Sequence, residues 1–505
     1  MIIVYHENNK VVEIDYNGES KSIPQNNIAE TLFEIAADHR DSLIVWCHTK
    51  LKSNLNSKRF DEVFHHNKIM ASYNPGERSF LSDAIGYVED SPFLKINKKV
   101  SYPTWQMSSA VGGIHASILN VLKEEIKKDR NFDYFLLSFA KLAMPNGVFC
   151  YSEPKLLNNL LEIIPINASN SFLLFRFVKQ HYKMRWIFLL FLNLFLYERR
   201  ISIGSLFVSI FYFRRKLDKN LSDTIQVQSI NKTVDKSTID VIIPTIGRKQ
   251  FLYDVLKDLS QQSHLPKNVI IIEQNPSQDS ESELDYLNME SWPFTIKHTF
   301  TRQAGACNAR NLALAEVESE WVFLNDDDNR FDSDLIEKVL EKASLYGVNC
   351  VTTSYLQKKE ILKFSIIHQS GIFGSGNSFL KSDFLNVVSF NKALEFGYGE
   401  DTDFGLQLRN LGVDIIYFPD LSILHLKAPM GGFRNKFVFP WEQKGESPKP
   451  SPNIMYVKSK YSTKQQLLGY KTVLFFKLNK LNIFDVSKFN TSWKLSVKWS
   501  KTLEK

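Results

Sequence analysis

The chain has 505 residues, of which 44% are hydrophobic and 23% are charged, and its formal net charge is +7 at pH 7. A chain of this length is expected to hold two or more domains with ample hydrophobic core. The modest surplus of Lys and Arg is spread along the sequence and forms no single recognition helix, so the composition argues against a nucleic-acid partner.

The cysteines of the chain are far apart and form no C-x-x-C pair, which argues against a zinc site and against a disulfide framework. They are Cys47, Cys150, Cys307 and Cys350. The first ten residues contain no basic segment followed by an apolar run, so we predict no export signal. A reducing cytoplasm is the expected location.

Residues 1–160 are predicted to form a mixed α/β accessory domain, with short strands such as 42–46 and a helix over 116–128. This segment offers little recognisable chemistry. His65, His66 and His115 are isolated in the sequence, and an isolated histidine is more often a surface residue or a hydrogen-bonded core residue than a ligand.

Residues 161–236 are predicted to form a helical connector that is apolar up to 217 and polar from 218. Its first apolar piece, 184–197, has 14 residues, whereas a helix needs about 20 to span a bilayer. A second piece covers 201–213, and basic residues flank both: Arg185, Arg199, Arg200, Arg214, Arg215 and Lys216. Two interpretations stay open, namely helices in the interface of an anionic inner leaflet and a buried helical hairpin between two domains.

A regular alternation of strands and helices begins at residue 237. The pattern predicts strands over 239–245 and 268–273 and helices over 250–262 and 306–317. Such alternation is typical of a parallel α/β sheet built from right-handed βαβ units.

An apolar run over 321–324 ends in three adjacent carboxylates, Asp326, Asp327 and Asp328. The run lacks alternation, as expected for a strand buried on both faces of a parallel sheet, and ligands of such sheets bind beyond the carboxyl ends of the strands. Three carboxylates repel one another there unless a cation offsets them. Asp326 and Asp328 are spaced to face one ion with the oxygen ligands that Mg²⁺ or Mn²⁺ prefers. A solvated acidic turn is the alternative.

Five motifs follow one another between residues 237 and 435. They are Val-Ile-Ile-Pro-Thr-Ile-Gly-Arg at 241–248, Gly-Ala-Cys-Asn-Ala-Arg-Asn at 305–311, Leu-Asn-Asp-Asp-Asp at 324–328, Gly-Ser-Gly-Asn-Ser-Phe at 374–379 and Gly-Glu-Asp-Thr-Asp-Phe-Gly at 399–405. In this order and spacing they resemble family 2 glycosyltransferases of the GT-A fold, of the bacterial cell-surface polysaccharide type. The resemblance implies a Rossmann-like GT-A catalytic domain over residues 237–440.

The resemblance also implies a set of residues that bind a nucleotide-diphosphate sugar. The set is Pro244, Thr245, Arg248, Glu273, Arg310, Asp326, Gly376 and Asn377. Glu273 is the best candidate for the contact with the base or ribose, and glycine at 376 lets the backbone approach the sugar closely. The guanidinium of Arg310 suits a diphosphate, although a structural pair with Asp326 or Asp328 is the alternative.

An inverting transferase needs a carboxylate that takes the proton from the acceptor hydroxyl, and a metal that stabilises the departing diphosphate. The family places the base in the pair formed by Glu400 and Asp401. We predict Asp401 as the base and Glu400 as its orienting partner or substitute, with helix-capping acids as the alternative. His425 lies where some relatives supply a further ligand, so the predicted metal set is Asp326, Asp328 and His425.

Parts of residues 1–160 parallel the later domain. A helix followed by an apolar strand over 28–48 parallels 312–327, but His48 stands where the acids are expected. Segments 105–113 and 131–154 parallel the Gly-rich and Glu-Asp segments, without acids at the motif positions. A degenerate, silent GT-A-like copy is one interpretation, and an unrelated α/β accessory domain is the other. Residues 441–505 are predicted to be a basic helical tail with a helix over 465–477.

Two classes of function remain. The first is an inverting, metal-dependent glycosyltransferase that takes a sugar from a nucleotide-diphosphate donor, with UDP as the expected nucleotide. Its acceptor would be a lipid-linked or growing cell-surface glycan at the cytoplasmic face of the membrane. The second is a catalytically silent carbohydrate-binding or scaffold protein. The presence of both acid motifs in the later domain favours the enzyme.

Overall fold

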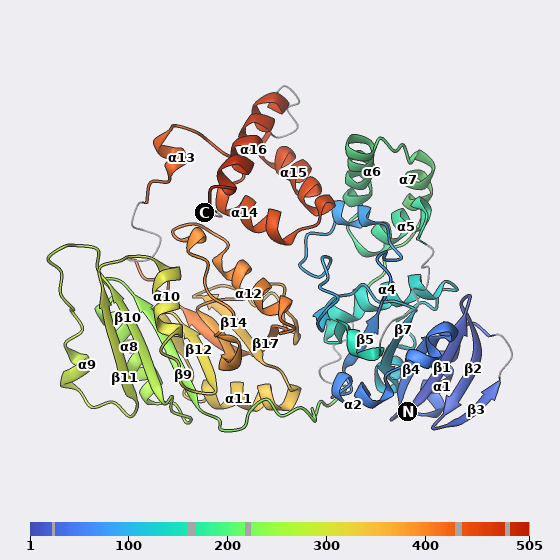
Figure 1. Cartoon of the computed structure of the whole chain (residues 1–505), viewed down its shortest axis with the longest axis horizontal. Helices are drawn as coiled ribbons and strands as arrows, with labels where there is room; N and C mark the ends of the chain where they lie inside the picture. Colours follow the sequence, from blue (N-terminus) through green and yellow to red (C-terminus); the bar gives the residue numbers. More distant parts are fainter. Residues whose placement is uncertain (23–25, 159–167, 218–223, 430–436, 480–484, 504–505) are drawn as a thin grey trace. The chain divides into compact units, whose positions relative to one another are not determined.

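The computed structural model describes residues 1–22, 26–158, 168–217, 224–429, 437–479 and 485–503. The chain divides into two compact units (Figure 1). The N-terminal unit comprises Met1–Asn231 and Tyr461–Leu481, and the C-terminal unit comprises Lys232–Lys460 and Asn482–Lys505.

The C-terminal unit is built on one mixed sheet with the strand order β11-β10-β9-β12-β16-β14-β17-β13. The strands are β9 (Ile239–Thr245), β10 (Asn268–Gln274), β11 (Thr295–Thr301), β12 (Trp321–Asn325), β13 (Asn329–Phe331), β14 (Cys350–Gln357), β16 (Asn377–Lys381) and β17 (Ile416–His425), and β15 (His368–Gln369) pairs with β17. The first four in sheet order are parallel, whereas β16 is antiparallel to β12 and β14. The predicted α/β class is confirmed, but the expected all-parallel sheet is corrected to a mixed one.

The strand β12 lies inside this sheet, and its side chains are buried. All four side chains from Trp321 to Leu324 are 0% exposed, as expected for a strand covered on both faces. The helices of the unit are α8 (Lys249–Ser260), α9 (Tyr286–Met289), α10 (Ala306–Leu314), α11 (Leu335–Tyr346), α12 (Glu400–Asn410), α13 (Pro440–Gln443), α14 (Pro452–Tyr461) and α16 (Val486–Ser500). Of these, α10 packs on β9 and β10, and α11 packs on β14 and β17.

The N-terminal unit holds a second mixed sheet, with the order β3-β2-β1-β4-β7-β5-β8-β6. The strands are β1 (Ile2–Glu7), β2 (Lys10–Tyr16), β3 (Glu19–Ser22), β4 (Leu43–His48), β5 (Ile69–Tyr73), β6 (Tyr102–Pro103), β7 (Val111–His115) and β8 (Phe149–Ser152). The helices are α1 (Ile28–Asp38), α2 (Phe60–Val63), α3 (Ala116–Leu122), α4 (Phe132–Ala143), α5 (Ser171–His181), α6 (Arg185–Glu198), α7 (Ile203–Ile210) and α15 (Lys464–Asn479). The helix expected over 116–128 is shorter in the structure, where α3 ends at Leu122.

Five strands follow the same path in both sheets. In the N-terminal sheet they lie in the order β1-β4-β7-β5-β8, and in the C-terminal sheet in the order β9-β12-β16-β14-β17. Each neighbouring pair also has the same direction in both units: parallel, antiparallel, antiparallel and parallel. The sheets differ at one side, where β2 is antiparallel to β1 but β10 is parallel to β9.

The apolar segments of the predicted connector form α5, α6 and α7, which belong to the N-terminal unit. One side of these helices lies in the core of the unit, with Phe175, Phe177, Ile187 and Leu190 fully buried. Part of the predicted tail also belongs here, because the hydroxyl of Thr472 on α15 donates to Asn193 on α6. None of the described helices is both long enough and apolar enough to cross a membrane.

Candidate active site

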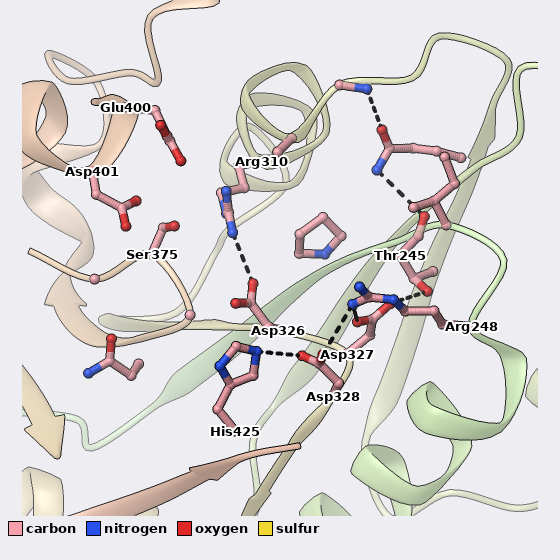
Figure 2. A pocket seen from close by; sticks show the side chains of 18 of the residues that line it. Thr245, Arg248, Arg310, Asp326, Asp327, Asp328, Ser375, Glu400, Asp401 and His425 are labelled. Carbon is pink, nitrogen blue, oxygen red and sulfur yellow. Dashed lines mark hydrogen bonds and ion pairs between the residues drawn. The ribbon is translucent and has the colours of Figure 1, made fainter. Parts of the chain in front are cut away.

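A cavity of about 470 Å³ opens where the carboxyl ends of β9, β10 and β12 meet the beginning of β16 (Figure 2). Ligands of α/β sheets bind at this kind of edge. Eleven of the twelve site residues expected from the sequence line the cavity, namely Pro244, Thr245, Arg248, Arg310, Asp326, Asp328, Gly376, Asn377, Glu400, Asp401 and His425. The fold therefore brings together residues that are up to 181 positions apart in the chain (Pro244 to His425).

Glu273 is the expected residue that does not line this cavity. It lines a small neighbouring recess, which shares Thr245, Arg248 and Gln274 with the main cavity. Its carboxylate accepts from the Ser282 hydroxyl at 2.6 Å and lies 2.9 Å from Nε2 of His298. Burial pushes its pKa upward, but these bonds outweigh burial and hold the pKa below its usual value. Any contact with a bound nucleotide would therefore be made from the recess.

The three acids after β12 point in different directions. Asp327 is buried and accepts from the Thr245 hydroxyl at 2.7 Å and from Arg248 at 2.6 Å. Burial raises the pKa of Asp327 to about 6 despite these two bonds. This acid also lines the cavity, and it ties the loop after β12 to the end of β9.

Asp326 faces the cavity from between two side chains. Arg310 on α10 donates to its Oδ1 at 2.9 Å, so the structural pair considered for Arg310 is present. The Tyr355 hydroxyl lies 3.2 Å from Oδ2 of the same carboxylate. A Cβ atom at Gly376 would come within 2.1 Å of this Oδ2, so only glycine leaves this oxygen accessible from the cavity.

Asp328 and His425 meet across the edge between β13 and β17. The two side chains are 3.5 Å apart from Oδ1 to Nε2, and the backbone N–H of Ala428 donates to Oδ2 of Asp328 at 2.8 Å. Burial pushes the pKa of Asp328 upward, but the bond with His425 and the Ala428 N–H outweigh it, so this pKa is lowered. The same pair raises the pKa of His425, whose ring stacks on Tyr355 with 4.7 Å between centroids.

Glu400 and Asp401 begin α12 on the opposite wall of the cavity (Figure 2). Burial first, and the charge of Asp401 second, raise the pKa of Glu400 to about 7. Burial also raises the pKa of Asp401, while Ser375 hydrogen bonds to it. Its Oδ1 is buried and has no hydrogen-bond partner among the described residues. A carboxylate oxygen in that condition is poised to accept a proton.

Sequence reasoning missed several residues that shape the site. Glu395 caps α10, because its carboxylate accepts from the backbone N–H groups of Cys307 and Asn308, each at 2.9 Å. Gln274 accepts from the N–H of Gly305 at 2.7 Å and fixes the start of the same helix. The other missed lining residues include Tyr355, Ser375 and Lys427. Of these residues, Ser375 had a signal in the sequence, because it lies within the Gly-rich motif at 374–379.

The donor set expected for a divalent metal has the right chemistry. Asp326, Asp328 and His425 offer carboxylate oxygens and an imidazole nitrogen, which suit Mn²⁺ or Mg²⁺. The glycine at 376 leaves Oδ2 of Asp326 accessible for such a ligand bond. Within the described ranges, no three acidic, histidine or cysteine side chains are already close enough to form a metal cluster. These residues fit a metal, therefore, although their arrangement is not that of a closed metal site.

The mixed α/β sheet thus places the acids after its central strand and the carboxylate pair of α12 around one cavity. Residues 240–393 match the model of Glycosyl transferase family 2. The chain thus contains a domain of glycosyltransferase family 2, as the motif order indicated.

Curated relatives cover parts of the chain. An uncharacterised glycosyltransferase of Haemophilus influenzae is 30% identical over 103 residues, which is 20% of this chain and 33% of that protein. An uncharacterised glycosyltransferase of Rickettsia conorii is 29% identical over 160 residues, which is 32% of this chain and 25% of that protein. The matched segments thus span a third or less of each relative.

Solved structures with some similarity include TarS of S. aureus. Residues 1–349 of TarS are 13% identical to this chain, with a TM-score of 0.36, over 53% of this chain and 80% of that one. The same fragment in complex with UDP-GlcNAc is 12% identical, with a TM-score of 0.36, over 52% of this chain and 81% of that one.

Proposed function

We propose that the C-terminal unit is a GT-A-type, inverting, metal-dependent glycosyltransferase. The donor is a nucleotide-diphosphate sugar, with UDP as the nucleotide, and the acceptor is a lipid-linked or growing cell-surface glycan. The supporting observation is a single cavity in a family 2 domain that has Asp326 and Asp328 on one wall and Glu400 and Asp401 on the other. The first pair suits a metal-bound diphosphate, and the second suits proton removal.

The donor would lie along the sheet edge. Arg248 and Arg310 supply positive charge on either side of the acids, since Arg248 contacts Asp327 and Arg310 contacts Asp326. A guanidinium is a planar cation whose N–H groups suit diphosphate oxygens. The recess beside Thr245, with Glu273 at its wall, suits the base or ribose.

The reaction needs one base. Asp401 would take the proton of the acceptor hydroxyl while the oxygen attacks the anomeric carbon from the face opposite the diphosphate. The bond between that carbon and the diphosphate oxygen breaks, its electron pair stays on the leaving group, and the sugar inverts. When bound by Asp326, Asp328 and His425, a divalent metal supplies charge that stabilises the departing diphosphate.

A donor-hydrolysis and transfer screen tests this function. The full chain is incubated with a panel of nucleotide sugars in the presence of Mn²⁺ or Mg²⁺, and release of the nucleotide diphosphate is measured. Turnover of one donor that disappears in the Asp401→Asn variant supports a transferase. Donor binding without turnover across the panel would instead indicate a silent carbohydrate-binding protein.

The pH dependence gives a separate prediction. Activity should fall as the solution is made acidic, because burial raises the pKa of Glu400 to about 7 and also raises the pKa of Asp401, and a protonated carboxylate cannot accept the acceptor proton. The measurement is kcat/KM between about pH 5 and pH 9 for the wild type and for Glu400→Gln. The acid limb should persist in Glu400→Gln if Asp401 is the base. Its disappearance in that variant would assign the base to Glu400.

We also propose that the N-terminal unit is a silent GT-A-like copy. The five shared strands support this, and so does the register. The last pair of β4 and β7 is Cys47 with Val111, and the corresponding pair of β12 and β16 is Asn325 with Asn377. The residue after Cys47 is therefore equivalent to Asp326, and it is His48, the last residue of β4.

One acid survives in this unit, contrary to the expectation that both motifs had lost theirs. Asp133 accepts from the backbone N–H of Ser109 at 3.1 Å, and Ser109 lies two residues before β7, as Ser375 lies two residues before β16. Burial raises the pKa of Asp133, as it does for Asp401. Asp133 thus occupies the position equivalent to the proposed base.

The equivalent of the catalytic cavity is filled by side chains. Phe132 stands where Glu400 stands in the other unit, and it is only 1% exposed. Its ring packs 5.2 Å from the ring of His6 and 5.9 Å from that of Trp46, measured between centroids. These rings occupy the space that a donor would need.

Substitutions of the two buried acids, Asp133 and Asp401, therefore make a matched pair of variants. Asp133→Asn should leave transfer within about twofold of the wild type, because the amide oxygen still accepts from Ser109 and the adjacent ring of Phe132 packs on His6 and Trp46. Asp401→Asn should remove transfer. The comparison is made by steady-state kinetics, and equal loss in both variants would refute a silent N-terminal unit.

A further inference from the structure

We propose that the outer side of α6 and α7 is a docking surface for an anionic lipid membrane. This surface, called the outer face below, consists of Phe188, Phe195, Ile201, Ile203, Phe207, Phe211 and Phe213. It lies on the N-terminal unit, and Figure 1 shows α6 and α7 as neighbouring helices in green.

Exposed apolar side chains are concentrated in this part of the molecule. Of the 30 large hydrophobic residues that are exposed in the described ranges, 11 lie between Phe172 and Phe213. The most exposed are Phe213 at 89%, Phe211 at 69% and Ile201 at 66%. Single exposed hydrophobic residues are normal, whereas a contiguous group of this kind marks an interaction surface.

The shorter of the two helices, α7, has its polar residues on the inner side and its apolar residues on the outer side. Ser205 and Ser209 are turned inward, at 4% and 1% exposed, while Ile203 and Phe207 are each 63% exposed. A helix that faced water on its outer side would place its serines outward and its Phe and Ile inward. The apolar outer side of α7 is therefore suited to an apolar environment.

The longer helix, α6, is apolar on both sides. Ile187, Leu190 and Leu194 are fully buried in the core of the N-terminal unit, whereas Phe188 and Phe195 are 47% and 45% exposed. These buried residues of the inner side hold α6 against the core of the N-terminal unit. In the described part of the unit the outer side thus stays about half exposed, so both interpretations left open by the sequence contain part of the answer.

Charge selects lipid as the occupant. Residues 171–217 contain nine Lys and Arg and one acid, Glu198, so this segment alone has a formal charge of +8. Arg215, expected from the sequence to contact lipid, instead pairs with Asp129 at 2.7 Å inside the unit, as Arg176 does at 2.5 Å. The basic residues that remain exposed are Lys183, Arg185, Arg199, Arg200, Arg214 and Lys216, of which Arg200 pairs with Glu198. A basic rim around an aromatic face fits a surface with anionic headgroups.

The helices are suited to lie in the plane of the membrane interface. The longest of them, α6, has 14 residues, which is about 21 Å of helix. The hydrocarbon core of a bilayer is about 30 Å thick. The outer face would therefore sink to the level of the headgroups and upper acyl chains, with α5 and the core of the unit on the aqueous side.

Flotation with liposomes tests the proposal without any need for transferase activity. The full chain is mixed with vesicles of phosphatidylcholine alone, or of phosphatidylcholine with phosphatidylglycerol, at low and high salt. We expect binding to the anionic vesicles that weakens with salt. The triple variant Phe207→Ser, Phe211→Ser, Phe213→Ser should bind at least about tenfold more weakly, because it loses three aromatic rings that would be buried in the lipid.

Two further variants separate charge from apolar contact. In the first, Arg185, Arg199 and Arg214 become Gln, and binding should lose its dependence on phosphatidylglycerol; Arg215 is left in place because it holds Asp129. The second is a matched control, Ile361→Ser with Phe364→Ser, which removes side chains that are 84% and 62% exposed elsewhere. It should bind like the wild type.

Several results would overturn the proposal. A wild-type chain that stays at the bottom of the gradient with anionic vesicles would do so, as would equal loss in the Ile361 and Phe364 control. Sedimentation of each variant without lipid provides a further check. A wild type that self-associates and becomes monomeric in the Phe207, Phe211 and Phe213 variant would assign the outer face to a second copy of the chain.

Discussion

Replacing Asp401 by Asn should lower kcat by roughly 10² to 10⁴, because the amide keeps the shape of the side chain but cannot take the proton of the acceptor hydroxyl. The carboxylate has the features that such a base needs. It is buried, its pKa is raised, and its Oδ1 has no hydrogen-bond partner among the described residues. The acids on the opposite wall, Asp326 and Asp328, are unchanged in this variant, so the affinity for the donor should change little.

The measurement separates the chemical step from binding. Single-turnover kinetics gives the rate of transfer, and titration with the nucleotide diphosphate gives the affinity of the site. Glu400→Gln is the matched variant, because Glu400 is the adjacent residue on the same helix and lines the same cavity. A larger fall in Glu400→Gln would exchange the roles within the pair, and full activity of both variants would exclude this pair from the proposed chemistry.

Replacing Asp328 by Ala should abolish transfer. This carboxylate carries one of the two oxygens offered to the metal, and its loss also leaves His425 without the anion that raises the pKa of its ring. The departing diphosphate would then lack the cation that offsets its developing charge. Excess EDTA should have the same effect on the wild type, and added Mn²⁺ or Mg²⁺ should restore activity.

Binding of Mn²⁺ provides a readout besides activity. Electron paramagnetic resonance of Mn²⁺ with the nucleotide diphosphate should show bound metal in the wild type and none in Asp328→Ala. Asp332→Ala is the control, because Asp332 lies four residues further along and is exposed. Full transfer by the wild type in excess EDTA would remove the metal from the proposed mechanism.

The sequence alone predicted most of the wall of the cavity, for a local reason. Each motif ends a strand or begins a helix, and parallel strands bring their carboxyl ends to one edge. Thr245 ends β9, Asp326 follows β12, and Asn377 begins β16. Order along the chain was therefore enough to indicate that these residues meet.

The direction of each acid was not available from the sequence. Three consecutive Asp residues are chemically alike, but Asp327 alone is held by both Thr245 and Arg248, 82 and 79 positions away. Glu395 likewise reaches back 88 residues to cap α10. Such contacts depend on which strands pair and on the register of the pairing, which local patterns do not specify.

In the N-terminal unit, too, some features could be predicted from the sequence and others depended on tertiary contacts. Its apolar strands and its likeness to the later domain were visible as a weak repeat. The survival of Asp133 was not, because the acid is recognised only by its bond to Ser109, 24 positions away. Nor could the sequence show that Phe132 fills the equivalent cavity, since that depends on the rings of His6 and Trp46 meeting it across the sheet.

The apolar helices show most clearly what the sequence determined and what only the tertiary structure decided. Composition established that residues 171–217 are apolar and basic. It also established that the two apolar pieces, 184–197 and 201–213, are each too short to span a bilayer. It could not determine which sides are covered, because α6 is apolar all round and its helical periodicity carries no preferred face. Tertiary packing decided this by burying Ile187 and Leu190 in the core while leaving Phe188 and Phe195 exposed. Hydrophobic burial is satisfied by any apolar neighbour, so only the fold determines which neighbour each side has.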